Sequence, residues 1–328
     1  MKRAALAALA VLSSTVAFAG CGQSDDRAAA GGRVGMTLAL DFTPNAVQAP
    51  VFTAVREGLD RRHGVRLRIR EPGQGPDGAK LVLSGRAQLA LLDIHDLAIA
   101  REHGAADIVA VGALVGRPLA ALLAQPSIHR PRDLEHKTVG VSGLPSDPAF
   151  LKAIMRADGG DASTARQVTI GFSAAQLLLT RKVDAVPAFW NAEGVALEEL
   201  GRKMSVFKVE DYGAPPYPEV LIITSRTTLA QRPDDLRTAL DALDDGLEST
   251  LRHPDRAVGW VADAAHATGR KATALVRAQL RAVAPTYASG LRLDRPVLAR
   301  WAAWEAKVGI VRHPPDVAKA FAFDLRPG

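Results

Sequence analysis

Residues 36–40 and 65–69 place an apolar side chain at every second position, and arginines fill the alternate positions of the second segment. This alternation is typical of β-strands with one buried and one solvated face. Other segments are apolar enough for buried strands, and segments with helical spacing separate them. The predicted strands are 36–40, 65–69, 89–92, 108–115, 138–141, 167–170, 185–189 and 220–224, and the predicted helices between them are 45–62, 79–84, 95–103, 148–157 and 173–180.

The order of these elements predicts the fold class. Strands and helices alternate, which favours an α/β fold with parallel sheets and helices on both faces. The proline-rich segment 211–218 interrupts this order, and a run of helices follows at 233–249, 254–268, 271–283, 295–308 and 315–321. Ligands of open α/β sheets bind beyond the carboxyl ends of strands, so a site is expected in the loops 41–45, 72–78, 92–96, 142–147, 189–193 and 211–218.

The first residues have the layout of a bacterial export signal. Lys2 and Arg3 precede an apolar run that ends in small residues at Cys21. The run is shorter than the roughly 20 residues that a membrane-spanning helix needs, and no later segment predicts one. Cys21 is the only cysteine, so no internal disulfide can form. We expect residues 1–20 to be a signal peptide and residues 21–32, which are small and polar, to be a flexible tether.

Phe18-Ala19-Gly20-Cys21 resembles the lipobox of bacterial lipoproteins, in which the cysteine thiol receives diacylglycerol before cleavage. The resemblance implies an exported protein that a lipid on Cys21 anchors to the outer face of the cell membrane or holds in the periplasm. The alternative is an ordinary secretory signal with a chance cysteine.

Composition and charge narrow the function classes. The net charge is +6, Lys2 and Arg3 contribute two of these charges, and 35 acidic residues dilute the remaining basic ones. Aromatic residues do not interleave with short basic clusters such as 66–70, which argues against a nucleic-acid surface. About 295 residues follow the tether, which is more than one hydrophobic core usually serves, so two lobes are expected.

The sequence predicts no metal centre and no cofactor. No two of the eight histidines stand three to five residues apart, which excludes a helical zinc pair. Ser142 lies in Gly140-Val141-Ser142-Gly143, which lacks the second glycine of a nucleophile elbow. A tight turn that faces a ligand is the favoured interpretation of Ser142 and Gly143, and a serine hydrolase is the alternative.

Aromatic residues make up only 5% of the chain, yet several of them fall at or near the ends of predicted strands. Such side chains offer flat surfaces for stacking a planar ring, and neighbouring amides and acids can hydrogen-bond to its edge. The alternative for each aromatic residue alone is packing in the core. The candidate pocket residues on this argument are Phe42, Phe189, Trp190, Tyr212 and Tyr217, with Asn45, Asn191 and Glu193.

Several segments resemble the NMT1/THI5-like group of thiamine-precursor binding proteins, within the type II periplasmic binding proteins. The resemblance covers roughly residues 33–320. Three segments are nearer to the pyrimidine binders, and the other two are general to the superfamily. The former are 40–45 (LDFTPN), 189–194 (FWNAEG) and 211–215 (DYGAP), and the latter are 80–87 (KLVLSGRA) and 130–140 (RPRDLEHKTVG).

The resemblance implies roles for particular residues. Phe42 looks like a stacking residue where the family usually has Trp, and Gln48 stands where the pyrimidine binders commonly carry His. Asp41 and Asn45 would make polar contacts in the same loop. Glu193 resembles the family's acid at the ring edge, a role that suits recognition of an amine-bearing heterocycle.

The resemblance also implies the architecture and the partners. Two doubly wound α/β lobes joined by a two-strand hinge would enclose a ligand cleft, with residues 33–119 and 226–328 in the first lobe and 120–225 in the second. Closure on an aminopyrimidine-like ligand would be read by the permease and ATPase subunits of an ABC importer. We expect a monomer that is not an enzyme and binds no nucleic acid.

Two alternatives stay open. The first is a receptor for another small solute, such as a sulfonate (taurine), nitrate or a riboflavin-like ring. An anion would need Arg117 or the amides of Gly143 and Leu144, and Glu193 argues against it. The second is an enzyme like the fungal pyrimidine synthases of this fold, which use an iron-dependent site rich in cysteine and histidine. The single cysteine of this chain does not supply such a site.

Cys21→Ala is expected to release the protein from the membrane without unfolding it, because the thiol precedes the predicted folded region. Membrane fractionation of expressing cells measures the release. Ser24→Ala, in the same predicted tether, is the matched control. A Cys21→Ala protein that stays with detergent-free membranes would contradict the lipoprotein interpretation.

Overall fold

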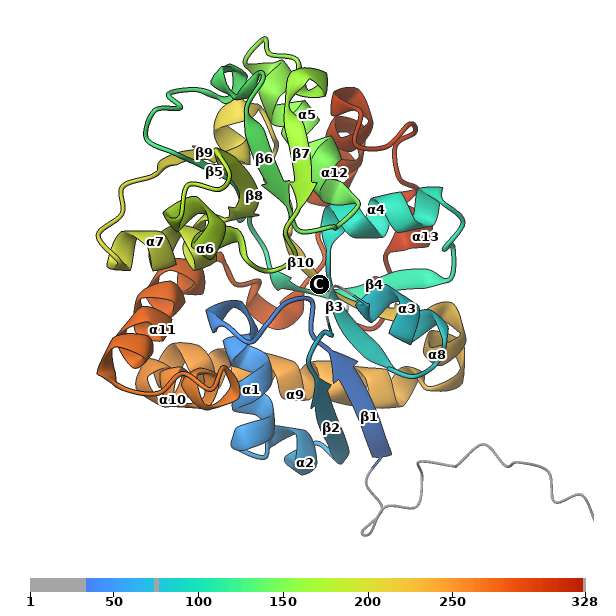
Figure 1. The fold of residues 1–328 in the computed structure, drawn as a ribbon. Helices are drawn as coiled ribbons and strands as arrows, with labels where there is room; N and C mark the ends of the chain where they lie inside the picture. Colours follow the sequence, from blue (N-terminus) through green and yellow to red (C-terminus); the bar gives the residue numbers. More distant parts are fainter. Residues whose placement is uncertain (1–33, 74–76, 327–328) are drawn as a thin grey trace, which may run out of the picture.

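The computed structural model describes residues 34–73 and 77–326, and the predicted signal peptide, Cys21 and the tether lie outside them. The described chain forms two α/β lobes, each built on a five-stranded sheet (Figure 1). The predicted fold class is confirmed. Within the described residues, no helix combines the length and the apolar composition that a membrane span requires.

The sheet of the first lobe has the strand order β2-β1-β3-β10-β4. Its edge strand β2 buries Val65 and Leu67 and exposes the arginines that alternate with them, as the sequence pattern predicts. The strands are β1 (Val34–Ala39), β2 (Val65–Arg70), β3 (Leu89–Asp93), β4 (Ile108–Val115) and β10 (Val220–Ser225), and the helices are α1 (Ala49–Arg56), α2 (Leu59–Arg62), α3 (Gly78–Leu83) and α4 (Ile94–Glu102).

The sheet of the second lobe has the order β7-β6-β8-β5-β9. A short π-helix, η5 (Trp190–Gly194), follows β8 directly and turns the chain toward the space between the lobes. The strands are β5 (Ala120–Ala124), β6 (Thr138–Val141), β7 (Arg166–Thr169), β8 (Ala185–Phe189) and β9 (Ser205–Lys208), and the helices are α5 (Ser146–Ala157), α6 (Ala174–Leu179) and α7 (Val195–Glu199).

The last hundred residues are helical and cover both lobes. Helices α9 and α10 pack on α1 of the first lobe, α11 contacts α7 of the second, and α12 contacts α13 and, through Glu305 and His95, α4. These helices are α8 (Arg226–Gln231), α9 (Pro233–Arg252), α10 (Pro254–Ala264), α11 (Arg270–Val283), α12 (Arg295–Val308) and α13 (Val317–Ala320). The short 3-10 helices are η2 (Ala46–Gln48), η3 (Pro131–Leu134), η4 (Ala162–Thr164), η6 (Val209–Tyr212), η7 (Ala284–Thr286) and η8 (Ser289–Leu291).

The chain passes between the lobes twice, at residues 116–119 after β4 and at residues 209–219 after β9. The second crossing leads into β10, which inserts between β3 and β4 of the first sheet. The expected boundary at residue 225 is therefore wrong for residues 220–225. The apolar pattern of residues 220–225 is compatible with either sheet. Their position in the first sheet depends on pairing with β3 and β4, which are distant in the sequence.

Both sheets are mixed rather than parallel. Strand β10 runs antiparallel to β3 and β4, and β5 runs antiparallel to β8 and β9. Each reversed strand follows a crossing, where the chain enters the sheet from the opposite end. The sequence pattern also does not predict strands β5 and β9 or helices α7 and α8, which are all short.

Helix α9 meets α1 at Gly246. A Cβ atom at this position would stand 2.4 Å from the carbonyl oxygen of Pro50 and 2.8 Å from the Cβ of Ala54. The carbonyl oxygen of Pro50 is part of the backbone of α1, so it cannot move aside for a Cβ atom as the end of a flexible side chain can. Glycine therefore sets the approach of the two helices that support the loop after β1.

Gly246→Ala is expected to lower the free energy of unfolding by about 1–3 kcal/mol, because the added methyl group pushes α9 away from α1. Gly259→Ala in α10 is the matched control, since nothing lies within 4 Å of its Cβ position. Alanine should stabilise that helix by roughly 0.5–1 kcal/mol. Urea unfolding of both variants measures the difference, and equal stabilities would show that the helices can separate freely.

Candidate ligand-binding site

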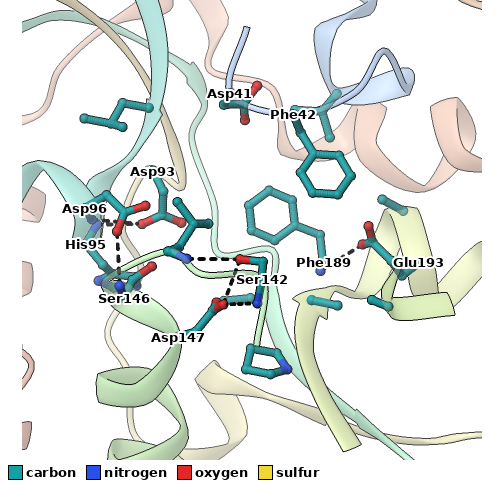
Figure 2. Close-up of a pocket in the computed structure, with 18 of the residues that line it drawn as sticks. Asp41, Phe42, Asp93, His95, Asp96, Ser142, Ser146, Asp147, Phe189 and Glu193 are labelled. Atoms are coloured by element: carbon teal, nitrogen blue, oxygen red, sulfur yellow. Dashed lines mark hydrogen bonds between the residues drawn. The ribbon is translucent and has the colours of Figure 1, made fainter. Parts of the chain in front are cut away.

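A cavity lies between the two lobes, among the loops that follow β1 and β3 in the first lobe and β6, β7 and β8 in the second (Figure 2). These loops leave the carboxyl ends of their strands, where ligands of open α/β sheets bind. The cavity has a volume of about 110 Å³, which suits one small molecule.

The loop between β1 and α1 is fixed by its own side chains. The side-chain oxygen of Asn45 caps η2 by accepting a hydrogen bond from the N–H of Val47 at 2.8 Å. Gln48 accepts a hydrogen bond from the N–H of Asn45 and donates one to Asp41, both at 2.9 Å. The loop thereby presents Asp41 and Phe42 to the cavity. Burial raises the pKa of Asp41, and the hydrogen bond from Gln48 opposes this effect.

Phe42 and Phe189 form an aromatic side of the cavity (Figure 2). The ring of Phe42 meets Phe172 of the second lobe edge-on, with ring centroids 4.3 Å apart and an interplanar angle of 66°. The carboxylate of Glu193 lies beside the rings and accepts a hydrogen bond from the N–H of Phe189 at 3.2 Å. Burial raises the pKa of Glu193. A planar ring can pack on these side chains while the acid binds N–H groups at its edge.

Three carboxyl groups face this aromatic side across the cavity, and we call them the acidic wall: Asp93, Asp96 and Asp147 (Figure 2). Asp93 caps α4 by accepting a hydrogen bond from the N–H of His95 at 2.7 Å. Asp96 reaches the other lobe, where it accepts a hydrogen bond from the N–H of Ser146, the first residue of α5, at 3.1 Å. The acidic wall thus joins the starts of two helices from different lobes.

Asp147 holds the turn after β6. Its carboxylate accepts hydrogen bonds from the N–H and the hydroxyl of Ser142, at 2.5 and 2.7 Å. The Ser142 hydroxyl is therefore bound to an acid and not to a histidine, which does not fit a serine hydrolase. Burial raises the pKa of Asp147. Burial, followed by the negative charge of Asp93, raises the pKa of Asp96 well above its ordinary value.

His95 is buried behind the acidic wall. Its Nδ1 bonds both carboxylate oxygens of Glu305 at 2.9 Å, and its Nε2 bonds the hydroxyl of Tyr217 at 3.0 Å. Burial lowers the pKa of His95, but the carboxylates of Glu305 and Asp93 more than offset this and raise it to about 10. The imidazolium therefore balances Glu305 in the core, and neither ring nitrogen is left for a ligand.

Asp93, His95 and Glu219 place possible metal ligands within 4.8 Å of one another. Both nitrogens of His95 are occupied, however, and Glu219 accepts hydrogen bonds from the N–H groups of Leu119 and of Ala120, the latter at 2.8 Å. These side chains serve the fold as they stand, and their arrangement does not fit a metal ion.

Acidic side chains outnumber basic ones in the lining of the cavity, and the imidazolium of His95 is already bound to Glu305. Five carboxyl groups line the cavity, and no lysine or arginine of the described residues does so. Arg117, which an anionic ligand would need, is exposed and lies outside the lining. Such a cavity repels anions and favours a cation or a molecule whose edge carries N–H donors.

Six predicted ligand residues line the cavity, namely Asp41, Phe42, Asn45, Gln48, Ser142 and Glu193, and five do not, namely Gly143, Trp190, Asn191, Tyr212 and Tyr217. The aromatic members of the second group pack elsewhere. Trp190 donates its indole N–H to the carbonyl of Pro118 at 3.4 Å. The ammonium group of Lys208 lies over the Trp190 ring, 4.1 Å from its centroid, in a cation–π contact. Tyr217 is fully buried against His95.

Tyr212 meets Phe207 edge-on and packs against the hydrophobic core, and Gly143 is exposed in its turn. Asn191 is completely buried, and its side-chain amide has no hydrogen-bond partner. For the three aromatic residues, the core-packing alternative describes the structure better than a pocket does. A strand-end position brings a side chain near the cavity, but its partners decide where it points.

The acidic wall is the part of the site that the sequence analysis misses. Asp93 and Asp96 follow the predicted strand 89–92, and Asp147 follows the predicted strand 138–141. These acids lie in loops that the strand-end rule singles out. The recurrence of Asp at the ends of separate strands is the signal that could have found them.

A small-molecule cavity between two α/β lobes defines the class, which is the type II periplasmic-binding-protein fold. The alkanesulfonate-binding protein SsuA of Xanthomonas axonopodis pv. citri superposes with a TM-score of 0.70 at 16% identity, over 88% of this chain and 98% of that one. SsuA of Escherichia coli gives a TM-score of 0.67 at 16% identity, over 87% and 91%. At this identity the likeness concerns the fold.

The chain belongs to the NMT1/THI5-like family, whose sequence model matches residues 45–257. It is 30% identical over 222 residues to the formylaminopyrimidine-binding protein of Halalkalibacterium halodurans, over 67% of each chain. It is 25% identical over 236 residues to the 4-amino-5-hydroxymethyl-2-methylpyrimidine phosphate synthase THI5 of Saccharomyces cerevisiae, over 68% of each chain. The family resemblance that the sequence motifs predict is therefore confirmed.

His95→Ala is expected to destabilise the fold by about 3–5 kcal/mol, because the Glu305 carboxylate stays buried without its cationic partner. The double variant His95→Ala/Glu305→Gln should lose less, since no unpaired charge remains in the core. Thermal unfolding at neutral pH compares the two variants. Additive losses in the double variant would contradict the ion pair.

The same pair predicts how stability depends on pH. Because the pKa of His95 is raised from 6.5 to about 10, its contribution is fully present below pH 6.5 and is lost as the pH rises through about 10. The double variant should lack this part of the alkaline decline. Unfolding curves across that interval provide the comparison.

Proposed function

We propose that this protein is the solute-binding component of an ABC importer and captures a thiamine-related aminopyrimidine between its lobes. The observation that carries the proposal is the cavity itself, which combines aromatic rings with five carboxyl groups. An aminopyrimidine is planar and carries N–H donors at its edge. Phe42 and Phe189 would contact the ring, and Glu193, with Asp41, would bind its edge.

The family supports this choice of ligand. The relative from Halalkalibacterium halodurans is a formylaminopyrimidine-binding protein by name, and it shares 30% identity with this chain. Sulfonates and nitrate fit less well, because the carboxyl groups of the cavity would repel them. The riboflavin-like ring of the other alternative is larger than a single pyrimidine, and a small cavity disfavours it.

Closure of the lobes would be the signal that the permease and its ATPase read. Contacts between the lobes surround the cavity: Asp96 accepts from Ser146, Phe42 meets Phe172, and the Gln279 amide donates to the carbonyl of Ala192 at 3.0 Å. A ligand that contacts both lobes shifts the equilibrium toward the closed form by its preference for that form. This function needs no bond-breaking step, and a monomer suffices for it.

The yeast synthases raise the possibility of an enzyme, since they share 25% identity with this chain. The cavity supports binding instead. His95 is the one histidine that lines it among the described residues, and both of its ring nitrogens are bound within the core. We therefore assign capture and delivery of the ligand rather than its synthesis.

The proposed location follows from the sequence of the first residues. An export signal over residues 1–20 would place the protein outside the cytoplasm, and a lipid on Cys21 would hold it at the membrane near the permease. The small and polar tether would let the two lobes reach their transporter.

Thermal unfolding of the chain from Gly22 onward tests the ligand. Ligand at about 100 times its dissociation constant adds roughly 2.7 kcal/mol, which raises the melting temperature of a chain of this length by about 4 °C. We expect aminopyrimidines to give this shift and thiamine, riboflavin, taurine and nitrate to give none. A shift with taurine or nitrate, or with no compound, would discard the pyrimidine assignment.

Glu193→Gln is the companion variant for this panel. The change removes the charge that receives the ring edge, so the shift with aminopyrimidine should shrink while the unfolding temperature without ligand changes little. Glu198→Gln, at an exposed position of α7, should behave as the unchanged protein does. Equal loss of stability and of binding in Glu193→Gln would make Glu193 a structural acid.

A further inference from the structure

The two sides of the cavity differ in chemistry. Phe42, Phe189 and Glu193 form one side, and the acidic wall forms the other, so that a bound ring would have carboxyl groups facing it from opposite directions (Figure 2). Glu193, with Asp41, already accounts for the N–H groups of a ring edge. The acidic wall therefore needs a partner that the ring itself does not provide.

Asp96 is the member of the wall that most clearly lacks a partner. The residue is 5% exposed and lines the cavity. Its Oδ1 accepts the hydrogen bond from Ser146, whereas its Oδ2 is buried without any partner. A buried polar atom without a hydrogen bond costs about 1–3 kcal/mol, so a group that supplies the missing donor would bind favourably here.

No neighbouring cation is available to neutralise this carboxyl. Among the groups around the acidic wall, the imidazolium of His95 is bound to Glu305, and Asp93 lies next to Glu219. The Tyr217 hydroxyl is bound to His95. The remaining groups on α4 and α5 that face Asp96 are Ser146 and the acid Asp147. The wall thus carries an excess of acid, and a positively charged donor would balance it.

We propose that the ligand carries a protonated alkylamine in addition to its planar ring, and that Asp96, supported by Asp147, binds this ammonium group. The inference rests on the proposed function and narrows its ligand to an aminopyrimidine with a basic side chain. The aromatic side holds the ring, and the wall receives the amine across the cavity. An ammonium group has three N–H donors and fills the open position at Oδ2 of Asp96.

The proposed ammonium site would give this protein a different ligand preference from that of the formylaminopyrimidine-binding protein. A formyl group on the amine removes both its charge and most of its basicity. A formylaminopyrimidine could still pack on Phe42 and reach Glu193, but it would bring no cation to Asp96. This protein should therefore prefer the free amine over its N-formyl derivative.

Calorimetric titration with a matched pair of probes tests the preference: an aminopyrimidine with a primary aminomethyl substituent, and the N-formyl derivative of the same compound. The wild-type protein should bind the amine at least about tenfold more tightly. Asp96→Asn should remove this preference by weakening the amine alone. Asp263→Asn, at an exposed position of α10, is the control and should keep the preference.

Proton release by the wild-type protein gives a second measurement that needs no variant. Burial and neighbouring acids raise the pKa values of Asp96 and Asp147, so an arriving ammonium group should displace protons from the wall. Titrations in two buffers with different heats of ionisation should show proton release with the amine and little with the formyl compound. Affinity for the amine should rise with pH as these carboxyl groups ionise.

The outcomes distinguish this inference from the proposed function. Equal affinity for the two probes, or equal weakening of both by Asp96→Asn, would overturn the ammonium site and leave the pyrimidine receptor in place. Binding of neither probe would overturn both. If Asp96→Asn does not fold, the wild-type affinity ratio and the proton release decide the question.

Discussion

One residue, Glu219, joins the two crossings on which both lobes depend. Its carboxylate accepts hydrogen bonds from the N–H groups of Leu119, which ends the first crossing, and of Ala120, which begins β5, while Glu219 itself ends the second crossing. Its backbone carbonyl accepts from Ile94 at 3.1 Å, and the carbonyl of Leu119 accepts from Trp190 at 3.0 Å. The start of α4, which carries Asp93 and Asp96, and the start of η5, which carries Glu193, are therefore fixed to the same point.

This common anchor explains how the cavity can have a defined shape although its sides come from different lobes. The loops near the crossings move least when lobes close about a hinge, whereas loops farther away must travel. Asp93 and Phe189 lie near the anchor. Phe42 and Phe172 meet from opposite lobes. The contact between Phe42 and Phe172 would depend on closure, whereas Asp93 and Phe189 could contact a ligand in either state.

Much of the fold follows from local patterns, but the pairing of strands does not. Strand β2 is evident from its alternating arginines, whereas β5 is a uniformly buried apolar segment whose identity depends on β8 and β9, far along the chain. The same limit applies to the site. Phe42 follows a strand and Tyr217 precedes one, so their local sequence positions look alike. Tyr217 belongs to the core because its hydroxyl binds His95, which in turn binds Glu305 far along the chain.

A cavity rich in carboxyl groups needs a source of stabilisation when no lysine or arginine of the described residues lines it. The helix starts provide one. Asp93 accepts from the first turn of α4, and Asp96 accepts from the first residue of α5. Helix N-termini carry partial positive charge that favours carboxylates, while burial favours their protonated form. The helix starts thus oppose the effect of burial on the carboxyl groups of the acidic wall, and a cation that enters the cavity favours their ionised form.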